Sequence, residues 1–225
     1  MRNAKFSNNT VKNGGDSPLS VGECPGCLVE NNLIIQDWPA PWPVYGISLG
    51  FDSPRAIDDV SNNVTIRNNT VWFGPKNVQG GIGIRVGNEP INVTRAQGIG
   101  HIIANNTVTY ASATSNFDVF SCYSYPLALS SYTAINNNHC QSSARFEWEK
   151  GSGNLAAWRT YSAASGFDTA SITGVNPNFT TPGTNFTPSA GSPLIGAGSA
   201  LYGSLFDMFG KVRKNPPAIG AVEGN

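Results

Sequence analysis

A six-residue phrase centred on two asparagines recurs five times in this chain and constrains the fold more than any other feature. Each copy places an apolar residue two positions before the first asparagine and another two positions after the second. The copies read FSNNTV, VENNLI, IRNNTV, IANNTV and INNNHC, and their first asparagines are 23, 37, 37 and 32 residues apart. Repeats with a period of 20 to 50 residues are typical of stacked units that share one core.

A second phrase, an alternating strand that ends in glycine, follows each of the first three asparagine pairs. It reads LSVG at 19–22, ISLG at 47–50 and IGIRVG at 82–87, with FDVFSC at 117–122 as a looser copy. One unit is therefore a strand, a bend at the asparagine pair, a second strand, a loop, a third strand and a loop. After glycine, asparagine best tolerates the left-handed backbone of such a bend. Amides stacked in register could hydrogen-bond along the units as a ladder. The alternative is a β-sandwich with asparagine-rich turns.

The phrases NNVTIRNNTVWF, GGIGIRVGN and GHIIANNTVTY resemble right-handed parallel β-helix repeat proteins, the pectate-lyase-like group, over residues 3–142. The resemblance implies an all-β chain, a right-handed parallel β-helix of about five coils. We expect the coils in residues 1–150 and a C-terminal capping segment in residues 151–225.

The C-terminal stretch resembles the terminal segment of many secreted β-helix proteins. In this chain the matching residues are NPNF at 176–179, followed by SPLIGAG, DMFGKVR and finally AIGAVE at 218–223. Gly196 and Ala218 depart from the usual pattern, which has aspartate at both positions. The resemblance implies a cap over the last coil, with Arg213 and Glu223 paired, and an extracellular or cell-surface location.

The four cysteines and the N-terminus leave alternatives open. Cys24 and Cys27 enclose Pro-Gly, so they could form a disulfide in a turn, remain free thiols, act in redox chemistry or supply half a zinc site. Cys122 and Cys140 could face each other across one coil. No signal peptide begins the sequence, so we expect either a piece of a longer protein or another export route. Seven N-x-S/T sequons occur, of which three are copies of the repeated phrase.

The outward positions of the glycine-ended strands are the candidate catalytic positions. Aligning these strands on their final glycines places Ser20, Ser48 and Arg85 in one column. Neighbouring strands lie about 4.8 Å apart, so Asp52 and Asp118 could both lie close to Arg85. Two carboxylates could cleave a glycosidic bond by hydrolysis. Alternatively, Arg85 could neutralise a uronate and favour β-elimination. The competing interpretation is a solvated surface with an Arg85–Asp52 ion pair.

Aromatic residues mark a candidate substrate-binding surface. The loop QDWPAPWPVYG holds Trp38, Trp42 and Tyr45 among three prolines, and Tyr123 could extend this platform. Rigid rings can stack on sugar faces at low entropic cost. They could instead cover the side of the stack as a satellite core.

Metal and further carboxylate candidates are weaker. Asp52, Asp58 and Asp59 offer oxygen ligands for calcium without EF-hand spacing, and we expect no other metal or cofactor. Glu147 and Glu149 fit an ordinary solvated strand.

The function expected from the resemblance is an extracellular protein that cleaves a polysaccharide, as a lyase or a glycoside hydrolase. The alternative is a non-catalytic carbohydrate-binding, adhesive or structural module, which would be trimeric if it were like a phage tailspike. The formal net charge is zero and 12% of residues are charged, so we expect no nucleic-acid partner. No apolar stretch is long enough for a membrane span.

Overall fold

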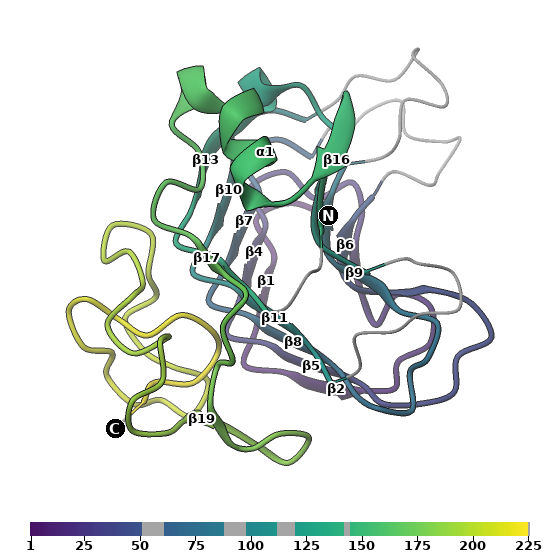
Figure 1. Ribbon diagram of the computed structural model, residues 1–225. Helices are drawn as coiled ribbons and strands as arrows, with labels where there is room; N and C mark the ends of the chain where they lie inside the picture. Colours follow the sequence, from purple (N-terminus) through teal and green to yellow (C-terminus); the bar gives the residue numbers. More distant parts are fainter. Residues whose placement is uncertain (51–60, 88–97, 112–119, 142–144, 225) are drawn as a thin grey trace.

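The computed structural model describes residues 1–50, 61–87, 98–111, 120–141 and 145–224, and it consists mainly of three parallel sheets (Figure 1). Sheet A contains β1 (Lys5–Ser7), β4 (Leu28–Glu30), β7 (Thr65–Arg67), β10 (His101–Ala104) and β13 (Tyr132–Asn136). Sheet B contains β2 (Thr10–Lys12), β5 (Leu33–Gln36), β8 (Thr70–Phe73), β11 (Thr107–Tyr110), β14 (His139–Cys140) and β17 (Ile172–Thr173). Sheet C contains β3 (Leu19–Val21), β6 (Val44–Leu49), β9 (Gly81–Val86), β12 (Phe120–Tyr125), β15 (Arg145–Trp148) and β16 (Gly151–Gly153).

Each turn of the chain visits the three sheets in the same order and adds one strand to each. Only β16, which pairs with β15, and the hairpin of β18 (Phe179–Thr181) and β19 (Asn185–Pro188) are antiparallel among the described strands. The predicted parallel β-helix is confirmed, and a β-sandwich with its antiparallel sheets is excluded.

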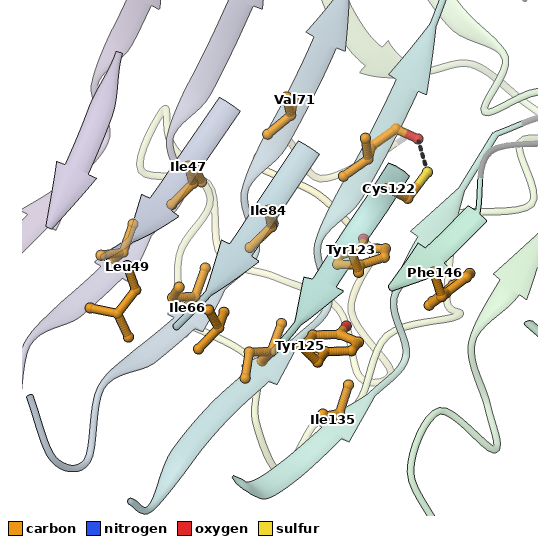
Figure 2. Packing of buried hydrophobic residues seen from close by; sticks show 14 of the residues in the cluster. Ile47, Leu49, Ile66, Val71, Ile84, Cys122, Tyr123, Tyr125, Ile135 and Phe146 are labelled. Atoms are coloured by element: carbon orange, nitrogen blue, oxygen red, sulfur yellow. Dashed lines mark hydrogen bonds between the residues drawn. The ribbon is translucent and has the colours of Figure 1, made fainter. Parts of the chain in front are cut away.

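The core lies inside the coils, where equivalent side chains stack from one turn to the next. In sheet C, the strand register places Ile47 beside Ile84, Ile84 beside Tyr123 and Tyr123 beside Phe146. All four side chains are fully buried, and Figure 2 shows them in one interior column. This stacking explains why the apolar positions recur in every copy of the repeat.

The two asparagines of each pair have different roles. The first adopts the left-handed conformation that lets the chain bend from sheet A into sheet B. Its φ is between 51° and 59° in every copy, at Asn8, Asn31, Asn68, Asn105 and Asn137. Other residues with a Cβ adopt this conformation at a cost, which accounts for asparagine at this position.

The second asparagine forms the ladder. Its Nδ2 donates to Oδ1 of the next asparagine along the stack, over 2.9 Å from Asn9 to Asn32, 3.0 Å from Asn32 to Asn69 and 3.0 Å from Asn69 to Asn106. Asn106 continues to Asn138 over 3.2 Å. The same Oδ1 atoms also accept the backbone N–H of the preceding asparagine, at 3.0–3.1 Å. Each buried amide thereby fixes the register of two turns.

The ladder ends on a buried carboxylate. Asn138 Nδ2 donates to Asp168 Oδ1 over 3.3 Å, and the Trp158 indole N–H donates to Asp168 Oδ2 over 2.7 Å. Ser171 Oγ also donates to Asp168 Oδ1. Burial raises the pKa of Asp168 above its ordinary 3.8, and the three hydrogen bonds oppose that increase. Asp168 thus supplies the last acceptor of the ladder.

The C-terminal segment lies along the side of the stack. The first asparagines of four pairs donate their side-chain amides to its carbonyls: Asn31 to Phe206, Asn68 to Ala218, Asn105 to Ser199 and Asn137 to Ala197. The resemblance implied that residues 176–223 cover the last coil. The end of the stack is instead occupied by α1 (Leu155–Tyr161), which belongs to the expected capping segment 151–225 (Figure 1). Trp158 of α1 packs with its ring 5.0 Å from that of Tyr125.

Two short 3-10 helices, at Leu129–Ser131 and Ala163–Ser165, complete the described secondary structure. The predicted Arg213–Glu223 pair is confirmed at 3.3 Å between Nη1 and Oε2, with both side chains buried. Disulfides join Cys24 to Cys27 and Cys122 to Cys140. The second disulfide connects sheets C and B across the interior of a coil, as the sequence suggested.

We predict that Asn69→Ala destabilises the fold more than Asn9→Ala. The first change removes the Oδ1 that accepts two buried Asn32 N–H groups, and it should lower the free energy of unfolding by about 3 kcal/mol. Asn9 is exposed at the end of the ladder, so its loss should cost about 1 kcal/mol or less. Equilibrium denaturation in urea measures both values, and equal losses would contradict the ladder's role.

The raised pKa of Asp168 predicts a pH-dependent difference between the protein and Asp168→Asn. In the unfolded chain, Asp168 loses its proton near pH 3.8, whereas in the folded protein it keeps the proton to a higher pH. The contribution of Asp168 to the free energy of unfolding is therefore fully present below pH 3.8 and is lost as the pH rises through the pKa of the folded state. The free energy of unfolding of wild type minus that of Asp168→Asn should therefore decrease as pH rises from 3.8. Urea titrations across this range test it, and a difference that increases with pH would refute it.

Candidate functional site

The outer face of sheet C carries one row of polar residues. The strand register aligns Ser20 with Ser48 and Ser48 with Arg85, as the alignment on glycines predicted. The row continues to Ser124 on β12 and Glu147 on β15. It crosses five neighbouring strands, which are spaced about 4.8 Å apart. A row of this kind can follow an extended ligand across the strands.

Arg85 is held in place at the middle of this row. Its Nη1 donates to the Tyr45 hydroxyl over 2.9 Å, and its Nε donates to the Gly87 carbonyl over 3.1 Å. The guanidinium carbon also lies 5.6 Å from the centre of the Tyr45 ring, within cation–π range. The predicted residues Arg85 and Tyr45 therefore come together, and they present a positioned cation at the surface.

Glu147 forms a second polar cluster at the end of the row. Ser121 Oγ donates to Glu147 Oε1 over 2.5 Å, and Arg145 Nε lies 3.6 Å from the same oxygen. Sequence reasoning assigned Glu147 to an ordinary solvated strand. The signal that could have identified it was the Arg85 row, which reaches Glu147 when the alignment is extended over two more strands.

A surface pocket of about 300 Å³ opens beside this cluster. Its lining includes Ser124, Arg145, Glu147, Trp148 and Glu149. Two carboxylates and a guanidinium at one pocket can supply the groups of general acid–base catalysis, and Trp148 adds an aromatic surface.

The two predicted catalytic aspartates, Asp52 and Asp118, lie outside the described residues, as do Asp58 and Asp59 of the calcium hypothesis. Within the described ranges, no group of three or more His, Cys, Asp or Glu residues could hold a metal ion. No helix in this part of the chain is long and apolar enough to cross a membrane.

Both histidines are buried away from the row. Burial lowers the pKa of His101 and of His139 to about 4. The His139 ring lies between Thr107 Oγ1, 2.6 Å from Nδ1, and the Val175 carbonyl, 3.0 Å from Nε2. His139 therefore lies on the outer face of sheet B beside Thr107, a face that the C-terminal segment covers at Thr70 and Thr107.

The aromatic residues divide between surface and core. Trp42 is 52% exposed, whereas Trp38 is partly buried and packs against the core. Tyr123 differs from the prediction, because its side chain is 0% exposed. Its hydroxyl lies inside the coil, 2.9 Å from the Asn106 carbonyl and 3.0 Å from the His139 carbonyl. Tyr123 therefore belongs to the core and cannot extend a surface platform.

We predict that replacing the two tryptophans of the proline-rich loop lowers the free energy of unfolding by different amounts. Trp38→Ala should lower the free energy of unfolding by about 2 kcal/mol, because it removes a ring packed on the core. Trp42→Ala should change it by less than about 0.5 kcal/mol, as is usual for an exposed side chain. Thermal and urea denaturation of both variants measure this, and equal losses would show that both rings are structural.

Comparison with known proteins adds no relative: no protein-family model matches this chain, and no curated protein sequence matches it. The fold assignment therefore rests on the strand pairing and the ladder.

Proposed function

We propose that this protein is an extracellular, polysaccharide-active β-helix of the pectate-lyase-like group that binds a linear acidic polysaccharide across the outer face of sheet C. The observation that carries the proposal is the row from Ser20 to Glu147, with Arg85 fixed at its centre by Tyr45. The strand spacing of about 4.8 Å is close to the length of one unit in an extended sugar chain.

The residues suit cleavage of a uronate-containing chain by β-elimination. Arg85 would pair with the uronate carboxylate and stabilise the negative charge that develops when a base removes the adjacent proton. Glu147 is a described carboxylate on the same face, two strands away, and it could act as that base. Breaking the glycosidic bond then leaves an unsaturated sugar end. Asp52 and Asp118 stay in the proposal as further acid–base candidates, with Trp38, Trp42 and Tyr45 as sugar contacts.

Hydrolysis is the alternative cleavage. Glu147 and Glu149 line one pocket, so one could protonate the leaving oxygen while the other activates water or attacks the sugar. This reaction produces a reducing end without unsaturation, which separates the two chemistries experimentally.

The disulfides support an extracellular location. The Cys122–Cys140 disulfide is buried and joins two sheets, and structural disulfides of this kind form and persist in oxidising compartments. Soluble polysaccharides outside the cell are accessible to a protein in such a compartment.

A second candidate function is non-catalytic carbohydrate binding, as an adhesive or structural module or a tailspike piece. One observation favours it. The Glu147 carboxylate already accepts from Ser121 and lies beside Arg145, so proton transfer would have to compete with these contacts. In this case the same row would bind the glycan without cleaving it.

Incubation with a panel of acidic and neutral polysaccharides tests the proposal. We expect acidic substrates to give both new reducing ends and the ultraviolet absorbance of unsaturated ends. Arg85→Ala should lower the rate about 100-fold, as removal of a charge-stabilising group does elsewhere. Lys12→Ala removes an exposed cation of β2 in sheet B, outside this row, and is the control that should retain activity.

The remaining outcomes separate the alternatives. Reducing ends without absorbance would replace β-elimination by hydrolysis, and Glu147→Gln and Glu149→Gln should then remove activity. Binding without cleavage, weakened by Arg85→Ala, would support the carbohydrate-binding module. Neither binding nor cleavage across the panel would contradict the proposed function.

A further inference from the structure

The stack of coils has an open end at β1, β2 and β3. Each of these strands stands at the edge of its sheet, and no described strand pairs with its outer side. Figure 1 shows β1 and β2, in purple, at this end of sheets A and B. The opposite end is covered by α1, whose Trp158 is fully buried. The two ends therefore differ, and the first presents three strand edges that can accept a further coil.

The apolar columns of the core are incompletely covered at this end. The strand register pairs three partly buried residues of the first coil with fully buried residues of the second: Phe6 with Val29, Val11 with Ile34 and Leu19 with Ile47. The two sets lie in the same columns and differ in having, or lacking, a described coil in front of them. A further coil would remove this apolar surface from water, which favours association.

The backbone of the first coil also faces outward at fixed positions. In sheet B, each later coil donates one N–H to the ladder asparagine of the coil before it, over 2.8–2.9 Å: Leu33 to the Asn9 carbonyl, Thr70 to that of Asn32 and Thr107 to that of Asn69. Thr10 holds this position in the first coil, because it is in register with Leu33. The same pattern directs the Thr10 N–H to the open side, where an incoming strand can accept it.

The asparagine ladder has a spare acceptor at the same end. Oδ1 of Asn32 accepts both the backbone N–H and the Nδ2 of Asn9, and Oδ1 of Asn69 accepts the same two groups of Asn32. Asn9 Oδ1 accepts from no residue that the structure describes. An asparagine at the bend of an incoming coil could donate the same pair of N–H groups to it. The interface between coils is therefore complete on the Asn9 side except for its donor.

A second copy of this chain fits the open end poorly. Because α1 covers the other end of the stack, two copies would have to meet through this same edge. Lys5 and Lys12 are both exposed there, so like charges would face each other across a two-fold axis. A segment with acidic residues suits the edge better.

We propose that the open end is an interaction surface for an extended segment of another protein chain, which adds to the stack as a preceding coil. The segment has apolar residues on both sides of an asparagine pair, and acidic residues that face Lys5 and Lys12. In such strand addition, main-chain hydrogen bonds supply affinity and alternate side chains supply specificity. The inference does not depend on the function proposed for sheet C, because it uses strand edges and not the Arg85 row.

A synthetic peptide of residues 28–50 is the probe. In the structure these residues form the coil that precedes β7, β8 and β9, so they already fit as a preceding coil. The peptide also carries two acidic residues, Glu30 and Asp37. Fluorescence anisotropy of the labelled peptide measures the Kd, which we expect below about 1 mM. Hydrogen exchange followed by NMR should show slower exchange of the Thr10 N–H when the peptide is bound.

Two variants of the protein test the contacts. Thr10→Pro removes the outward N–H and should abolish binding. Asn9→Ala removes the spare Oδ1 and should raise the Kd about tenfold. Asn185→Ala, a change of another exposed asparagine on β19 in the C-terminal hairpin, is the matched control and should bind as wild type does. Circular dichroism and thermal denaturation establish that each variant is folded.

The proposal is overturned if the peptide binds with a Kd above about 1 mM, or if Thr10→Pro and Asn9→Ala bind it as wild type does. Sedimentation velocity provides a separate test of the partner. Concentration-dependent dimers that Thr10→Pro abolishes would show that a second copy occupies this end, and they would also overturn the proposal.

Discussion

The asparagine ladder is the interaction on which the rest of this structure depends. A parallel β-helix has no local turn that fixes how one coil sits on the next, and a slip of one residue would direct every inward side chain outward. Here each buried amide donates to the coil on one side and accepts two N–H groups from the coil on the other. The hydrogen bonds form only in one register, so the ladder aligns the core columns and, with them, the outward row of sheet C.

The paired asparagines also join the two parts of the chain. The first asparagine of each pair bends the backbone, and in four of the five pairs its side-chain amide also donates to the C-terminal segment. Asn31 in addition accepts a hydrogen bond at Oδ1 from the hydroxyl of Ser204, 173 residues later in the chain. The buried Arg213–Glu223 pair then organises the segment itself, since the Arg213 guanidinium also donates to the Gly220 and Ala221 carbonyls. One repeated dipeptide thus serves the coil, the stack and the docking of the chain end.

The sequence predicted what the repeat encodes locally and missed what depends on distant contacts. The left-handed bends, the ladder and the Ser20–Ser48–Arg85 column follow from phrases that recur at each coil, so alignment alone was sufficient. The prediction that Tyr123 lies at the surface was wrong, because the sequence around a tyrosine at a strand is equally compatible with a surface and a core position. Only the structure shows that interior carbonyls lie within reach of its hydroxyl. Asp168 gave no signal, because the ladder ends there without an asparagine pair, and the course of the C-terminal segment has no local pattern.

Hydrogen exchange of the ladder's backbone amides, followed by NMR, tests most directly whether the ladder holds the coils in register. The N–H groups of Asn32, Asn69 and Asn106 donate to buried side-chain oxygens rather than to a strand. We predict that they exchange only through global unfolding, as slowly as the amides of Ile84 and Ile103 in the core strands. Exchange of these three amides at the rate of exposed turns, while the strands stay protected, would show that the ladder opens independently and does not fix the register.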